Sequence, residues 1–152
     1  MIRLSALMAV LTLPLSTLAD GPMPLSAMPK TYRAECGSCH VPYPPALMSA
    51  SGWRTIMAGA HAHFGENSVP DEPVRREIET YLTEHAATSD RRFASRTNPP
   101  RLSSTSWFRR THGRVKTWFA NALVGSASNC AACHRLAEDE RYAREEVALP
   151  SP

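Results

Sequence analysis

Apolar residues recur at helical spacing in the first half of the chain. Trp53, Ile56, Met57 and Ala60 lie three or four positions apart, so they share one face of a predicted helix. Ser51, just before this stripe, is a residue type suited to the N-cap. The stripe is predicted to pack into the core of the protein.

A second stripe predicts another helix, over about residues 71–87. Val74, Ile78, Tyr81 and Leu82 form its apolar face, and Pro73 falls in its first turn, where proline is tolerated. The simplest use of this face is core packing.

The second half of the chain has shorter and less regular patterns. The polar, basic stretch 89–101 ends in Asn98-Pro99-Pro100, which predicts a boundary between a first lobe, 20–90, and a second lobe, 91–152. Apolar pairs at 107–108 and 118–119 predict two short segments, and Ser126 is suited to cap a further helix. We find no strand pattern of convincing length. The predicted fold is therefore mainly α, with two lobes and little or no sheet.

The N-terminus resembles a secretory signal peptide. Arg3 precedes an apolar run over 4–15, and Thr17-Leu18-Ala19 supplies small residues for cleavage, which predicts a signal peptide over 1–19. The run is short for a bilayer span, although an uncleaved anchor is the alternative. No other run approaches membrane length. We expect an exported, periplasmic protein with no membrane span after cleavage.

All four cysteines lie in two copies of the pattern Cys-x-x-Cys-His, at 36–40 and 130–134. This pattern is typical of c-type haem attachment. Two thiols three positions apart, on one turn of helix, can each bond a vinyl group of one haem, and the following histidine then coordinates the iron. The first copy ends a predicted helical segment over 31–40. The motifs predict two covalently attached haem c groups, with these attachment and ligand residues: Cys36, Cys39, His40, Cys130, Cys133 and His134.

Other readings of the cysteine pairs explain less. A dithiol redox pair would need a βαβ pattern around it, and none is visible. A zinc site could use four thiolates, but it would not need a histidine directly after each pair. The duplicated histidine and the export signal favour haem, and they support each other because bacteria attach c-type haem outside the cytoplasm.

The second axial ligand of the first haem is predicted to be His63. It lies at the end of the predicted helix, directly before Phe64 and Gly65, where a turn can aim it at a haem face. His61 is two residues away and would point elsewhere. His61, Met48 and Met57 remain the alternatives, because a methionine can also bind haem iron.

The second axial ligand of the second haem is predicted to be His112. It is the only unassigned histidine of that lobe, and no methionine follows Met57. The alternative is a surface histidine in a basic run, which would leave the iron open. The remaining histidine, His85, is interpreted as a solvated residue near a helix C-terminus.

The residues around these motifs resemble those of a known family. The relevant features are Trp53 with Met57, His63-Phe64-Gly65, Trp107-Phe108 with His112, Gly125-Ser126, Asn129 before Cys130, and Leu149-Pro150. Together they are similar to the bacterial dihaem cytochrome c family called DHC, over about residues 32–150. One departure lies within 137–141, where we expect a glycine and find Glu138-Asp139-Glu140.

The resemblance implies a first lobe like a class I cytochrome c and a less regular second lobe. It also implies bis-histidine ligation at both irons, with the distal histidines at His63 and His112. Electron exchange with other redox proteins is implied too, for example a membrane cytochrome b or an oxygen-binding cytochrome c.

Composition and charge add limits on function. The formal net charge is only +3, so nothing points to nucleic acid, and long-range steering is not expected to select partners. The leading hypothesis is a periplasmic electron carrier rather than an enzyme. One alternative is a haem enzyme or gas-binding protein with one open or labile haem, acting on peroxide, NO or O2. Another is a subunit docked permanently on a larger respiratory complex.

Overall fold

The computed structural model describes residues 27–150, and this part of the chain is mainly helical. The predicted signal peptide, 1–19, lies outside the described residues. No strand forms between residues 27 and 150, where only isolated bridges such as Ser49 with Ala87 occur. The predicted mainly α fold is confirmed.

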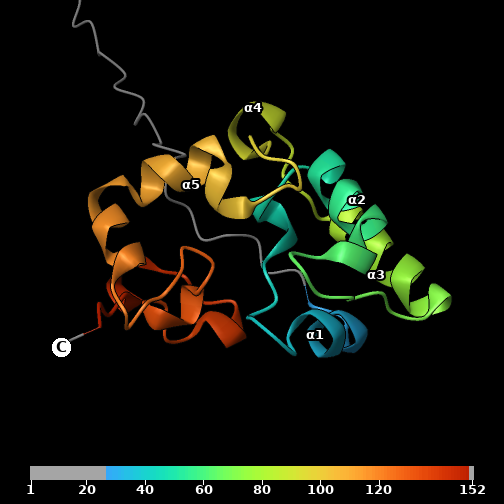
Figure 1. Cartoon of the computed structure of the whole chain (residues 1–152), viewed down its shortest axis with the longest axis horizontal. Helices are drawn as coiled ribbons and strands as arrows, with labels where there is room; N and C mark the ends of the chain where they lie inside the picture. Colours follow the sequence, from blue (N-terminus) through green and yellow to red (C-terminus); the bar gives the residue numbers. More distant parts are fainter. Residues whose placement is uncertain (1–26, 151–152) are drawn as a thin grey trace, which may run out of the picture.

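Short helices alternate with loops along the chain. The α-helices are α1 (Lys30–Cys36), α2 (Ala50–Ala58), α3 (Glu72–Glu84), α4 (Asp90–Phe93) and α5 (Ser106–Thr111). The 3-10 helices are η1 (Pro45–Leu47), η2 (Ala60–Ala62), η3 (Leu102–Ser104), η4 (Gly113–Ala120), η5 (Cys130–Ala132), η6 (Ala137–Asp139) and η7 (Arg144–Glu146). Figure 1 shows α1, α2 and α3 at one side of the molecule and the segments after α5 at the other.

Both predicted apolar stripes face the core. Trp53 and Met57 on α2 are buried, as are Ile78 and Leu82 on α3, and the two helices pack on each other. The indole of Trp53 also donates a hydrogen bond to the carbonyl of Pro45, 2.8 Å away, which satisfies its buried N–H. These two helices form the best-packed part of the fold.

The core continues into the second half of the chain. Tyr32 of α1 packs on Tyr81 with ring centroids 5.3 Å apart, and the same cluster includes Leu102 and Phe108. The apolar surface of α5 therefore contributes to one core together with α2 and α3. The division into lobes at residue 90 stays a prediction.

Local geometry corrects three expectations. Helix α1 ends at Cys36, because Gly37 caps it by bonding to the carbonyl of Arg33, so the two thiols of the first motif do not share one helical turn. The cap of α2 is Ser49, whose extended backbone lets its hydroxyl accept from the N–H of Gly52. The helix expected after Ser126 is only the 3-10 turn η5.

The reason for the last difference lies in the serine itself. The hydroxyl of Ser126 accepts a hydrogen bond from the N–H of Ser128, 3.1 Å away, and so closes a local turn. Serine side chains compete with helix formation in this way. Within residues 27–150, no helix is long and apolar enough to cross a membrane.

The departure from the family pattern at 137–141 has a clear structural counterpart. Glu140 follows η6 with φ 58° and ψ 22°, in the left-handed region that favours glycine. A side chain at this position costs about 1–2 kcal/mol in backbone strain. The expected glycine therefore corresponds to a real turn, which this chain builds with glutamate.

We predict that Glu140→Gly stabilises the protein relative to Glu140→Ala by about 1 kcal/mol, because only glycine removes the strain. Both variants remove the carboxylate, so the comparison isolates the backbone effect. Denaturant unfolding of the two variants measures it. Equal stabilities would show that the turn is not strained.

Candidate functional site

The first cysteine motif lies where α1 ends. Cys36 is half-buried as the last helical residue, and Cys39 is exposed. The Nδ1–H of His40 donates to the carbonyl of Val41, 2.8 Å away. This bond fixes the ring and leaves its Nε2 as the nitrogen available to a metal.

His63 lies opposite His40. The two ring centroids are 6.3 Å apart, with 35° between the ring planes. The chain reaches this position because η2 ends at His63, and left-handed backbone at Phe64 (φ 51°) and Gly65 (φ 106°) turns the chain directly afterwards. The turn closes with a hydrogen bond from the N–H of Glu66 to the carbonyl of His63.

The second motif has an equivalent pair. His134 lies opposite His112, with ring centroids 6.2 Å apart and 71° between the planes. His112 follows the last residue of α5, and its Nδ1–H donates to the carbonyl of Phe108, 3.2 Å away. The ring of Phe108 stacks on His112 at 4.1 Å, and Phe119 lies 6.2 Å away, so apolar rings wall the site.

The two histidine spacings fit a shared metal ion. An imidazole centroid lies about 1.1 Å behind its coordinating nitrogen, and a metal–nitrogen bond is about 2.0 Å, so rings that share one metal have centroids about 6.2 Å apart. The structure gives 6.3 and 6.2 Å for the two pairs. The stacked pair of Phe108 and His112 is closer, at 4.1 Å, and leaves no room for an ion between its rings.

Burial favours the metal-binding form of His63, His112 and His134. Burial lowers the pKa of His63, with the nearby charges of His40 and Arg101 adding to the effect. Burial also lowers the pKa of His112 and of His134, so neutral imidazole is favoured. The Nδ1 of His134 is buried without a hydrogen-bond partner in the described part of the chain.

The first thiol of each motif lies in apolar surroundings. Burial raises the pKa of Cys36 to about 12 and that of Cys130 to about 11. Between residues 27 and 150 no group of three or more histidine, cysteine or acidic side chains could hold a metal ion. Each motif places its thiols near two opposed histidine rings, and these residue types are ones that can hold a c-type haem.

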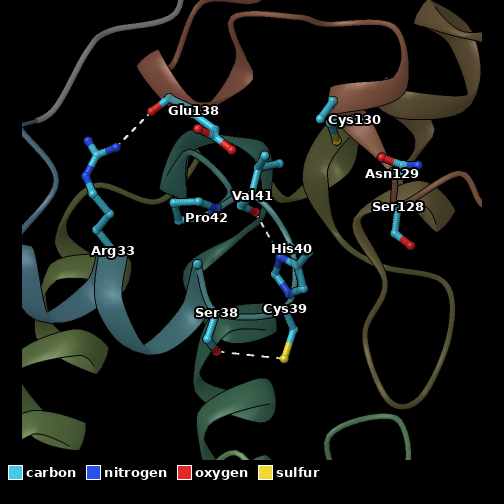
Figure 2. A pocket seen from close by; sticks show the side chains of 12 residues that line it. Arg33, Ser38, Cys39, His40, Val41, Pro42, Ser128, Asn129, Cys130 and Glu138 are labelled. Carbon is cyan, nitrogen blue, oxygen red and sulfur yellow. Dashed lines mark hydrogen bonds between the residues drawn. The ribbon is translucent and has the colours of Figure 1, made fainter. Parts of the chain in front are cut away.

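A pocket of about 650 Å³ joins the two motifs. Its lining includes Cys39 and His40 from the first motif and Asn129 and Cys130 from the second (Figure 2). Its size is typical of small-molecule and cofactor sites. The pocket does not include His63, His112 or His134, so it opens between the attachment residues rather than between the histidine rings.

Arg33 spans one side of this pocket. It donates from Nη1 to the carbonyl of Glu138, 2.8 Å away, and so links α1 to η6 (Figure 2). The two motifs therefore lie next to each other, although 93 positions separate Cys130 from Gly37 in the chain.

Tyr43 is a site residue that the sequence did not reveal. Its ring stacks on His40 at 4.6 Å with only 12° between the planes, and its hydroxyl donates to the carbonyl of Ser128, 2.8 Å away. Tyr43 thus contacts His40 of the first motif and Ser128, which lies two residues before the second motif. The proline-rich stretch 41–45 has no helical or strand periodicity from which a contact could be predicted. The closeness of Tyr43 to His40 in the sequence is therefore the only feature that could have pointed to it.

Tyr142 was missed for a similar reason. Its ring lies 5.2 Å from His134, and its hydroxyl donates to the carbonyl of Ala137 at 3.3 Å. Each motif histidine therefore has a tyrosine neighbour.

The alternative ligands lie elsewhere. Met48 and Met57 are buried in the core cluster. His61 is exposed, and His85 is exposed at the end of α3, where its Nδ1–H donates to the carbonyl of Tyr81. The histidine pairs of the prediction are the ones that lie together, and their role as iron ligands stays a prediction.

We predict that Tyr43→Phe lowers the free energy of unfolding by about 1 kcal/mol, because it removes the bond to Ser128 and keeps the ring on His40. Tyr142→Phe is the matched control, and its longer bond predicts a smaller loss. Denaturant unfolding measures both. A Tyr43→Phe variant as stable as the parent protein would exclude this bond as a link between the motifs.

The chain is similar to known cytochromes. A family model described as dihaem cytochrome c matches residues 32–142. The crystal structure of a dihaem cytochrome c from Shewanella baltica OS155 is 37% identical, with a TM-score of 0.69, and the match covers 82% of this chain and 96% of that chain. A dihaem cytochrome c from Rhodobacter sphaeroides is 37% identical, with a TM-score of 0.67, over 78% of this chain and 99% of that one.

A second structure from Rhodobacter sphaeroides, of DHC purified from that organism, is 38% identical over 78% of this chain and 100% of that one, with a TM-score of 0.65. Among curated protein sequences, none matches this chain.

Proposed function

The chain belongs to the dihaem cytochrome c family, and on that premise we propose that it carries electrons between redox proteins, with each haem iron held between two histidines. The protein is a c-type cytochrome with two haem c groups, and its cysteines are present for their covalent attachment. The identity of the axial ligands, the role in electron transfer and the periplasmic location belong to this proposal.

The observation that carries the proposal is the spacing of the two histidine pairs. His40 with His63 and His112 with His134 each leave the separation that one metal ion requires. When both axial positions are filled by side chains, no position remains for a substrate. Haem iron then supplies one-electron exchange between its ferric and ferrous states.

The surrounding residues suit this role. Backbone carbonyls accept the Nδ1–H of His40 and of His112, which fixes the rings in both oxidation states. Tyr43 and Phe108 stack on these rings and limit their movement. Rigid ligands keep the reorganisation energy of electron transfer small, because the iron ligands move little when the oxidation state changes. This favours an electron carrier over an enzyme.

We further propose that the protein acts in the periplasm. Support comes from the predicted signal peptide over 1–19 and from the attachment of c-type haem outside the cytoplasm. Its partners are then other redox proteins, such as a membrane cytochrome b or an oxygen-binding cytochrome c, met either transiently or within a lasting complex.

Ligand substitution tests the carrier proposal. We predict that His63→Ala and His112→Ala each convert one of the two haems from low spin to high spin, because each removes one axial ligand. Electron paramagnetic resonance of the oxidised holoprotein measures the change. His61→Ala and His85→Ala are the matched controls, and both should leave two low-spin haems.

Two results would contradict the assignment. If His61→Ala produced the high-spin haem and His63→Ala did not, the first ligand would be wrong. If the unchanged holoprotein contained a high-spin haem or bound carbon monoxide rapidly on reduction, an enzyme or gas-binding protein with an open haem would replace the carrier.

A further inference from the structure

Charge is strongly segregated along this chain, although the net charge is small. Residues 91–137 contain nine basic side chains and no aspartate or glutamate. The nine are Arg91, Arg92, Arg96, Arg101, Arg109, Arg110, Arg114, Lys116 and Arg135. The small net charge of +3 is therefore the sum of a basic middle segment and two acidic flanking segments. The net charge alone did not indicate that one region has a strong local positive potential.

The structure leaves these nine side chains in solvent. Each is exposed, and none forms an ion pair within the described part of the chain. Three arginines outside this segment behave differently, since Arg75, Arg76 and Arg141 pair with glutamates. Like charges repel one another, so nine exposed basic side chains without a protein carboxylate as partner create a local positive potential.

Four of the nine surround a candidate iron ligand. Arg109 and Arg110 lie in the last turn of α5, directly before His112, and Arg114 and Lys116 lie on η4 directly after it. Figure 1 shows α5 and the turns that follow it along the outer edge of the molecule. We call Arg109, Arg110, Arg114 and Lys116 the basic ridge.

The ridge flanks one member of the second histidine pair in the chain. Phe108, the neighbour of Arg109, is buried and stacks on His112, whose ring in turn lies 6.2 Å from that of His134. The same short helix therefore has an apolar side chain against the site and charged side chains in solvent. A partner that binds the ridge contacts the segment that carries His112.

We propose that the basic ridge docks the acidic face of a one-electron redox protein, and that electrons pass between this partner and the second haem site. This inference rests on the proposed function, since it names the surface through which the same electron carrier binds a partner and the kind of partner that binds there. The exchange moves one electron and no proton: the partner is oxidised by one electron as one iron of the chain goes from ferric to ferrous, or the reverse.

The surface around the ridge favours a protein partner over a lipid surface. Helices that lie on membranes combine basic residues with exposed apolar side chains that enter the bilayer. Among residues 27–150 the exposed large apolar residues are Phe64, Val69, Leu123, Val147 and Leu149, and none belongs to α5 or η4. Charge alone suits the rapid, salt-sensitive encounters of redox proteins.

Neutralisation of the ridge tests the proposal in the holoprotein. The test variant is Arg109→Gln with Arg110→Gln, and the matched control is Lys30→Gln with Arg54→Gln, which removes the same charge from exposed, unpaired positions outside the ridge. The probe is a reduced plant-type ferredoxin, an acidic low-potential donor. Stopped-flow absorbance measures the second-order rate of electron transfer at low and high ionic strength, and calorimetric titration with oxidised ferredoxin measures binding.

We expect the ridge variant to react about tenfold more slowly than the parent protein at low salt and to bind more weakly, because steering by local charge is lost. The difference should vanish at high salt, where the Debye length is only about 3 Å at 1 M. The control should stay within about twofold of the parent. Reduction by photoreduced lumiflavin, a small neutral reagent, should be the same for all three proteins.

Several outcomes would overturn the docking surface. Equal ferredoxin rates for the ridge variant and the control would exclude it. A shifted midpoint potential of the second haem would place the arginines in the haem site instead. The ridge would instead bind a lipid surface if two results came together. The parent protein would bind vesicles of phosphatidylcholine with phosphatidylserine more tightly than the ridge variant does, and the ferredoxin rates of the two proteins would be equal.

A second variant guards against local misfolding of α5. Arg114→Gln with Lys116→Gln changes only η4 and should show the same loss. Failure of the carrier proposal would be distinct, because the parent holoprotein would then contain a high-spin haem or would not be reduced by lumiflavin.

Discussion

Two opposed pairs of imidazole rings define this molecule, and most of the chain serves to hold them apart at a fixed distance. Each pair joins segments that are distant in sequence: His40 with His63, and His112 with His134. Backbone carbonyls accept the Nδ1–H of His40 and of His112, so in both pairs a ring is oriented by the protein with its Nε2 left for a metal. One iron between the two rings of each pair is the proposal that accounts for this arrangement, with the haem attached through the cysteine motif beside the pair.

The two sites rest on unequal supports. The first is held by α1, α2 and α3, whose apolar faces share one core that includes Tyr32, Trp53 and Ile78. The second is built from short turns, and between residues 121 and 150 the buried apolar side chains are Val124 and Ala137. The second half of the chain therefore depends more heavily on its cofactor for a core. Tyr43 and Arg33 connect the two halves through hydrogen bonds to Ser128 and Glu138.

Sequence reasoning was reliable where a pattern is local and periodic. The two cysteine motifs predicted the two haem c groups of the family, and the stripes around Trp53 and Ile78 identified the buried helix faces. It was less reliable where one residue could cap or close a turn in two ways, so Ser51 was chosen in place of Ser49 and Ser126 was assigned a helix that does not form.

Other features of the site depend on contacts between distant segments. The stacking of Tyr43 on His40 follows no spacing rule, and neither does the exposure of the arginines beside His112. Glu140 shows the opposite case, since the family pattern anticipated a glycine and the backbone there adopts the conformation that glycine favours. A summed net charge likewise hides how the charges are distributed, which only their order and exposure reveal.

Near-infrared magnetic circular dichroism of the oxidised holoprotein tests the central claim most directly, because the charge-transfer band of low-spin ferric haem reports the identity of both axial ligands. The account predicts a single class of signal, typical of two imidazole ligands, with an intensity equal to two haems per chain. A band typical of methionine ligation, or an intensity equal to one haem, would contradict it.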